Sequence, residues 1–153
     1  MSLRNLKELK EICDFLRLQG YTNVEIADAG NYINIPDRDI RIQINVIDPP
    51  DEENVFLFIG TEDNEGINWQ FTQNDYLIFV DGQRYYLANT ESLKEFIELN
   101  NFKNSSRVHS HRNSRVILIK IKKSWLVYGL MEDVKVFYRL AYPDKTLRGK
   151  EVI

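Results

Sequence analysis

Acidic side chains are concentrated in residues 35–66, which hold nine acidic and two basic side chains. Asp37 and Asp39 stand at the start of a predicted strand, and Glu62 and Asp63 follow an apolar run. Carboxylate oxygens are the ligands that Mg²⁺ prefers, and an ion held by them can polarise a phosphodiester and activate water. The acids of this segment are therefore more than enough to supply the ligands of a divalent cation such as Mg²⁺.

Basic side chains dominate residues 101–123, which hold seven of them and no acid. A row of cations without an intervening acid is typical of phosphate binding, because each contact releases counterions. Trp125 follows this segment, and its ring can stack on a base. The predicted nucleic-acid-binding residues are Lys103, Arg107, Arg112, Arg115, Lys120, Lys122, Lys123 and Trp125.

Each candidate also has a structural alternative. The Asp37 carboxylate can accept local backbone hydrogen bonds in a turn, and most of the other acids can solvate loops. The basic residues can belong to a solvated loop and one polar strand face. Trp125 can pack in the core or lie half-buried.

Several other kinds of site are absent from the sequence. It has no GxGxxG, GxxxxGK[ST], HExxH or GxSxG motif. The single cysteine, Cys13, lies on the apolar stripe of a predicted helix and is interpreted as a core residue. One cysteine excludes a disulfide within the chain and favours a reducing, cytoplasmic setting. His109 and His111 would face the same way on a strand, but their polar neighbours favour a solvated pair over a metal site.

The composition is typical of a folded soluble protein. The chain has 153 residues, 43% of them hydrophobic and 28% charged, and a net charge of −3. No apolar stretch reaches the roughly 18 residues that a membrane-spanning helix needs. We expect one domain over residues 1–153, with a core at about 3–142 and a tail at 143–153.

The first half of the chain is predicted to form one helix and four strands. Apolar and polar residues alternate strictly over 39–46, as in a half-buried strand. The unbroken apolar run 55–59 predicts a strand that is buried on both faces and ends at Gly60, before a loop at 61–67. The predicted elements are a helix at 3–19 and strands at 24–26, 32–35, 39–46 and 55–59.

The second half is predicted to begin with a hairpin, in which strands 76–80 and 83–87 flank the turn signal Asp81-Gly82. Thr90 or Ser92 is predicted to cap a helix that reaches about Asn100, and Ser92 with Glu95 fits a capping box. An exposed loop at 101–114, a strand at 115–121 and extended segments at 125–131 and 134–142 follow, with a helix as the alternative for the last. These elements predict an α+β or α/β fold with a mixed central β-sheet flanked by helices.

This order of elements resembles the restriction-endonuclease-like fold of the PD-(D/E)XK nuclease superfamily. The resemblance covers roughly residues 3–100. It rests on the element order and on Pro36-Asp37, Asp39, the run Asn74 to Val80, and Tyr85-Tyr86-Leu87 before a helix. It implies that Asp37 or Asp39 is the first metal-binding acid and that Glu62 or Asp63 is the second.

The sequence departs from that family at the lysine, which should stand two residues after the second acid. Asn64 and Glu65 occupy the two positions that could hold it. Either a lysine from elsewhere, Lys120 or Lys122, completes the site, or the site is degenerate. For an active enzyme, the implied catalytic residues are Asp39, Glu62 and Lys120.

These observations predict a nucleic-acid-binding protein that binds DNA or RNA and acts as a small nuclease dependent on Mg²⁺ or Mn²⁺. The alternative is a catalytically inactive module of the same fold that binds nucleic acid or a protein partner. A third hypothesis is a protein–protein interaction domain that pairs through exposed strand edges. We expect no membrane partner, and the oligomeric state stays open.

Overall fold

The computed structural model describes residues 6–27, 31–47, 53–100, 107–109, 115–130 and 133–139. Lys103, Arg112, His111 and the expected tail at 143–153 therefore lie outside the described residues. For Arg107 and His109 only the backbone is described.

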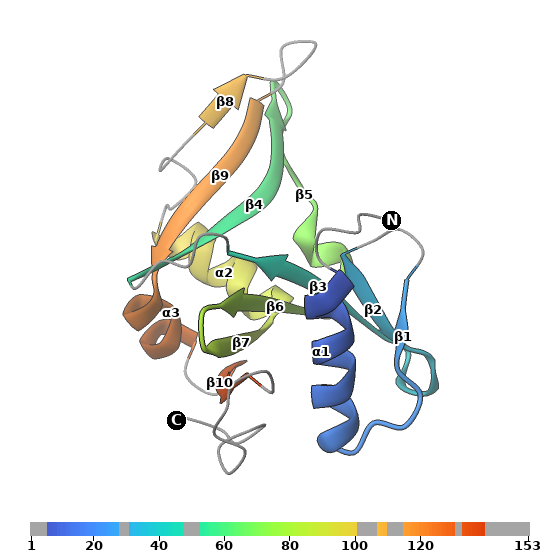
Figure 1. Ribbon diagram of the computed structural model, residues 1–153. Coiled ribbons are helices and arrows are strands. Elements are labelled where there is room, and N and C mark those ends of the chain that lie inside the picture. Colours follow the sequence, from blue (N-terminus) through green and yellow to red (C-terminus); the bar gives the residue numbers. More distant parts are fainter. Residues whose placement is uncertain are drawn as a thin grey trace.

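The first of two sheets has six strands in the order β1-β2-β3-β6-β7-β10 (Figure 1). Neighbouring strands are antiparallel except β3 and β6, which are parallel, so this sheet is mixed, as predicted. Its strands are β1 (Glu25–Ile26), β2 (Tyr32–Ile35), β3 (Ile40–Val46), β6 (Tyr76–Asp81), β7 (Arg84–Asn89) and β10 (Val134–Tyr138).

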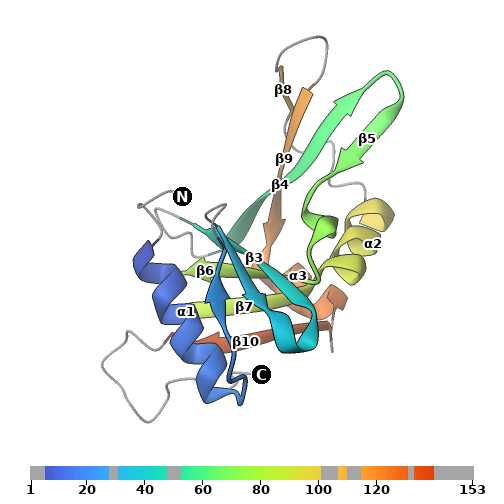
Figure 2. The ribbon, with the colours of Figure 1, turned by 90° about the vertical axis from the view of Figure 1, so that its right-hand side faces the viewer.

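The second sheet is antiparallel and has the order β5-β4-β9-β8. Its strands are β4 (Asn54–Asp63), β5 (Gly66–Trp69), β8 (Arg107–His109) and β9 (Arg115–Lys122). The far ends of these strands extend beyond the first sheet, as Figures 1 and 2 both show. The hairpin of β4 and β5 leads through a short 3₁₀ helix, η3 (Phe71–Gln73), into β6.

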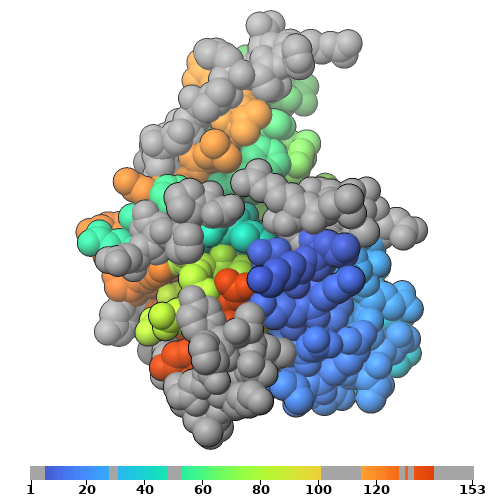
Figure 3. Space-filling model, in the orientation of Figure 1, coloured from blue at the N-terminus to red at the C-terminus, as the bar shows by residue number. Residues whose placement is uncertain are grey.

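Helix α1 (Leu6–Leu18) covers one face of the first sheet, and Figure 3 shows it at the surface in blue. The predicted apolar stripe explains this placement, because Leu9, Ile12, Cys13 and Leu16 are buried, and Phe15 is buried beside them. Cys13 belongs to this stripe and is 4% exposed, which confirms it as a core residue. Burial raises the pKa of its thiol.

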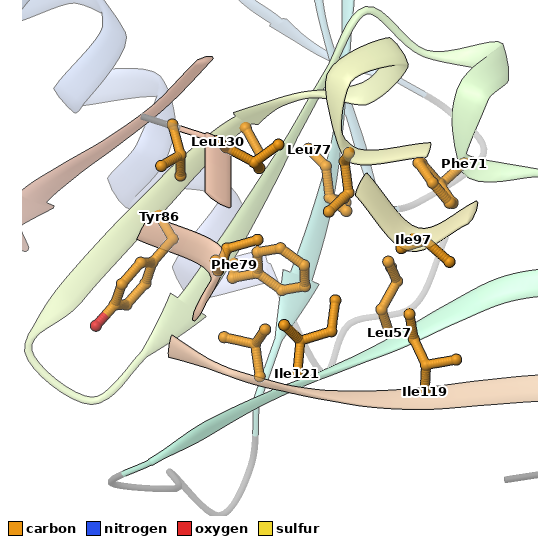
Figure 4. Close-up of a cluster of buried hydrophobic side chains, with 14 of the residues drawn as sticks. Leu57, Phe71, Leu77, Phe79, Tyr86, Ile97, Ile119, Ile121 and Leu130 are labelled. Atoms are coloured by element: carbon orange, nitrogen blue, oxygen red, sulfur yellow. The ribbon is translucent and has the colours of Figure 1, made fainter. Parts of the chain in front are cut away.

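The opposite face of the first sheet packs against the second sheet, α2 (Thr90–Asn100) and α3 (Lys123–Leu130). Alternation along the strands divides the side chains between the two faces. In β6, for example, Leu77 and Phe79 join this larger core, while Ile78 and Val80 face α1. Figure 4 shows Leu57, Ile119 and Ile121 of the second sheet within the larger core.

Two buried ionic contacts connect the layers. Arg139 binds Glu11 of α1 with Nε–Oε2 and Nη2–Oε1 distances of 2.9 and 3.1 Å, and Tyr85 of β7 donates a hydrogen bond to the same carboxylate. At the same turn end of the β6–β7 hairpin, Asp81 of β6 forms an ion pair with Lys123 of α3. Both contacts link segments that are distant in the sequence.

Strand β4 differs from its prediction. It is longer than 55–59 because the chain passes through a β-bulge between Phe58 and Gly60 and continues to Asp63. Residues 61–67, expected as a loop, contribute to β4 and β5 instead. Strand β4 is also buried on one face alone, since Phe56 is 43% exposed.

The segment 125–131, expected to be extended, is helical in its described part, α3. Leu126 and Leu130 are four residues apart and both buried, so one face of the helix enters the larger core. The expected strand at 134–142 is confirmed over β10, and the described part of this segment, which ends at Arg139, contains no helix. Part of the expected loop at 101–114 is strand β8.

The β6–β7 turn and the cap of α2 involve other residues than the sequence predicts. The β6–β7 turn consists of Gly82-Gln83, because Asp81 still pairs with Arg84. Asn89 caps α2 in place of the predicted Thr90 or Ser92, since its Oδ1 accepts a hydrogen bond of 3.1 Å from the Ser92 backbone N–H. The Ser92 hydroxyl donates to Asp133 instead.

Candidate nucleic-acid interface

The first pair of predicted metal ligands lies in the connection between β2 and β3. Asp37 belongs to a 3₁₀ helix, η2 (Pro36–Arg38), and its Oδ1 lies 3.4 Å from the Asn23 amide nitrogen. Asp39 ends this helix in a left-handed conformation, with φ of 52°. It lines a polar pocket of about 340 Å³ together with Asp75 and Glu91. Asp37 thus contacts a side chain from an earlier part of the chain, and Asp39 takes the left-handed position that ends the turn.

The second pair lies at the far end of the second sheet. The Asp63 carboxylate accepts a hydrogen bond of 2.8 Å from the Glu65 backbone, which closes the β4–β5 turn. Glu62 stands opposite Arg115 of β9 in the strand register. Figures 1 and 2 show this hairpin end well separated from the β2–β3 connection.

The structure thus does not bring the four predicted metal ligands together. Among the residues it describes, no three His, Cys, Asp or Glu side chains gather in a way that could hold a metal ion. The carboxylates of the two pairs do not fit one Mg²⁺ or Mn²⁺ site, because such an ion needs its oxygens within about 2.5 Å.

The expected lysine of the catalytic trio is also apart from the acids. Lys120 is exposed on β9, while its neighbours Ile119 and Ile121 point into the core. Arg115 lies five residues before Lys120, so alternation places it and its partner Glu62 on the other face of the sheet. Asp39, Glu62 and Lys120 therefore form no common site.

The predicted basic residues divide into two groups. Lys120 and Lys122 are exposed on the same face of β9, and Arg115 is exposed from the other face. Lys123 is 17% exposed in its side chain and forms the ion pair with the buried Asp81. Its ammonium also lies 5.8 Å from the centre of the Tyr86 ring. Lys123 thus has a structural role, whereas Lys120 and Lys122 face solvent.

Trp125 lies at the start of α3, directly after β9. It is 51% exposed. The Lys122 ammonium lies 5.3 Å from the centre of its ring, a cation–π distance. The indole is thus half-exposed beside a lysine and presents part of its surface to solvent.

Strand pairing adds residues that the sequence analysis missed. Phe56 of β4 stands opposite Lys120, and Phe58 stands opposite Leu118. Phe56 and Leu118 are 43% and 41% exposed, and Phe58 is half-buried. We call this solvent-facing surface the outer face; it consists of Asn54, Phe56 and Phe58 of β4 and Leu118, Lys120 and Lys122 of β9.

The opposite side chains of the same strands hold the outer face in place. Val55, Leu57, Ile119 and Ile121 are at most 1% exposed and anchor both strands in the larger core. The Asn45 amide of β3 also donates a hydrogen bond of 2.6 Å to the Phe56 carbonyl oxygen. A rigid sheet therefore presents the outer face, which preorganises its side chains.

The charge of the outer face is positive. Its six residues include two lysines and no acid, although the whole chain is net negative. Each lysine has an aromatic ring beside it, since Phe56 stands opposite Lys120 and Trp125 adjoins Lys122. Cations and rings side by side can contact both the phosphates and the bases of a nucleic acid.

Comparison with protein-family models, with curated proteins and with solved structures found no match to this chain. The resemblance to the restriction-endonuclease-like fold therefore stays a prediction beyond the mixed α+β architecture. In the part of the chain that the structure describes, no helix is long and apolar enough to cross a membrane.

Proposed function

We propose that this protein binds nucleic acid through the outer face of its second sheet, without cleaving it. One observation carries the proposal: exposed lysines and aromatic rings share one rigid strand face that holds no acid. The basic segment of the sequence supports the same function. The separation of the acidic residues favours a binding module over the nuclease alternative.

Lys120 and Lys122 are the residues that contact phosphates in this proposal. They are two positions apart on one strand, which sets their Cα atoms about 7 Å apart. Each ammonium that neutralises a phosphate releases condensed counterions, so binding weakens as the salt concentration rises. No described acid of the outer face competes with the phosphates for these lysines.

The test measures the binding of fluorescently labelled oligonucleotides by anisotropy over a range of salt concentrations. The variant is the double substitution Lys120→Gln and Lys122→Gln. We expect weaker binding and a slope of log K against log salt that is less steep by about 0.7 per lysine for a single strand, or 0.9 for a duplex.

The matched control is Lys7→Gln with Lys10→Gln, which removes the same charge from exposed positions of α1. We expect this control to bind almost as the unaltered protein does. The proposal fails if the protein binds no oligonucleotide even at low salt. It also fails if both double variants lose affinity equally, because the effect would then reflect net charge alone.

A further inference from the structure

We infer that the outer face recognises single-stranded nucleic acid by stacking bases on Phe56, Phe58 and Trp125. This inference rests on the proposed function and specifies its ligand. Lysines alone can bind the phosphates of either a duplex or a single strand. The aromatic residues are what distinguish the two.

The exposed aromatic side chains of the described residues converge on this surface. The large hydrophobic side chains with high exposure are Leu18, Phe56, Leu99, Leu118 and Trp125. Phe56 and Leu118 belong to the outer face, and Trp125 adjoins it through Lys122. Both aromatic members of the set are therefore on or beside the same lysine-bearing strand face.

The chemistry of these rings favours stacking over the reading of base edges. In a duplex the flat faces of the bases are covered by their neighbours, and proteins read the edges through hydrogen bonds. A phenylalanine ring has no hydrogen-bonding group, but it can stack on any base that is unstacked. Phe56 and Phe58 can thus stack on the bases of a single strand, and they contribute little to the binding of a duplex.

The spacing of the rings leads to the same conclusion. Phe56 and Phe58 are two residues apart on one side of β4, about 7 Å along the strand. Bases stacked in a duplex are about 3.4 Å apart along each strand. Bases that stack on both rings must therefore be spread to about twice the duplex spacing, which an extended single strand allows.

The lysines complete this arrangement. Lys120 lies across from Phe56, and the Lys122 ammonium lies beside the Trp125 ring. An oligonucleotide that runs along β4 and β9 would meet a cation beside each of these two aromatic positions. Stacking tolerates every base, so we expect little sequence preference and binding of both DNA and RNA.

The decisive experiment compares three labelled probes of one mixed sequence of about 12 nucleotides: single-stranded DNA, single-stranded RNA and duplex DNA. We expect the unaltered protein to bind both single strands at least about tenfold more tightly than the duplex. The variant Phe56→Val keeps a residue that favours strands but removes the ring, and we expect it to weaken single-strand binding about fivefold or more. Duplex binding should be unchanged.

The matched control is Leu99→Ala, which removes a side chain that is 78% exposed on α2. It should bind as the unaltered protein does. A second variant, Trp125→Leu, should weaken single-strand binding without loss of folding. Thermal unfolding of each variant establishes that the variants are folded.

The outcomes separate the inference from the proposed function. Equal affinity for duplex and single strand, with Phe56→Val unchanged and the lysine double variant weakened, overturns the stacking inference and leaves the proposed function standing. If the unaltered protein binds none of the three probes, both the stacking inference and the proposed function are overturned. Binding of polyglutamate as tight as that of the single strands also overturns both, and indicates an acidic protein partner.

Discussion

Arg139 binds the Glu11 carboxylate of α1 through two nitrogen–oxygen contacts of 2.9 and 3.1 Å. The two side chains are 16% and 9% exposed. A third guanidinium contact, of 2.8 Å, reaches the Gly82 carbonyl oxygen in the β6–β7 turn. This bidentate contact joins the first helix to the end of the chain that the structure describes.

We expect Glu11→Ala and Arg139→Ala each to lower the free energy of unfolding by roughly 3 kcal/mol, because either change leaves a buried charge without its partner. Urea unfolding measures this. The control is Asp14→Ala, which breaks an exposed ion pair with Arg17 and should cost less than about 1 kcal/mol. Equal losses in the three variants would contradict the buried role.

Tyr85 should make the stability of the protein vary with pH in the alkaline range. Burial and its hydrogen bond to Glu11 raise the pKa of its hydroxyl above the value of about 10 found in unfolded chains. The folded state therefore holds the proton more tightly, and this stabilisation is complete below pH 10 and falls as the pH rises above it. Unfolding measured from pH 8 to 11 should show a smaller loss in Tyr85→Phe. An identical loss would exclude this role.

Substitution of Lys123 should affect stability, whereas substitution of Lys120 should affect binding. Lys123→Gln leaves the Asp81 carboxylate buried without its cation, and we expect it to destabilise the protein by roughly 3 kcal/mol. Lys120→Gln should change stability by less than about 0.5 kcal/mol but weaken oligonucleotide binding. Chemical denaturation and anisotropy test both. Asp81→Asn should recover part of the loss in Lys123→Gln, and additive losses would contradict the ion pair.

Gly60 should tolerate no side chain. Its φ is +148°, and a Cβ atom there would lie 1.9 Å from the Asn68 backbone oxygen of β5. We expect Gly60→Ala to cost at least about 2 kcal/mol and to increase hydrogen exchange in β5. Gly66→Ala is the control, because φ is +121° there but nothing lies within 4 Å. It should cost less, and the opposite order would refute the close contact.

Incubation with labelled DNA and RNA in the presence of Mg²⁺ or Mn²⁺ tests the nuclease alternative. We expect no cleavage, because the structure keeps Asp39 and Glu62 in different parts of the fold. Asp39→Asn should fold as the unaltered protein does, since asparagine also accepts the left-handed conformation of this turn. We expect this variant to leave metal binding unchanged. Cleavage that both Asp39→Asn and Glu62→Gln abolish would restore the nuclease hypothesis.

Elements with a clear period were predictable from the sequence. The alternation of 39–46 corresponds to β3, and the helical stripe of 3–19 corresponds to α1. The second half of β4 and strand β5 were missed because Thr61 to Ile67 is mostly polar. There, strand formation depends on the bulge at Gly60 and on pairing with β9.

The cations of the candidate interface and Trp125 were predictable from the sequence, but Phe56 and Phe58 were not. The basic run identified Lys120 and Lys122, and both are exposed. Phe56 looked buried because its neighbours on both sides are apolar. Its exposure follows from the register that places it opposite Lys120, and register between distant strands is a tertiary property. α3 was missed for a similar reason, since Trp125 and Val127 favour extended structure locally.

The pairing of β4 with β9 delays completion of the fold during synthesis. Residues 54–63 leave the ribosome well before 115–122. Strand β5 pairs with β4 only at residues 60–63. Until β9 emerges, Val55 and Leu57 have no partner strand and their apolar edge is open to other nascent chains. Such distant pairing also slows folding. Truncated products that stop at Asn100 should therefore aggregate and recruit chaperones more readily than the full chain.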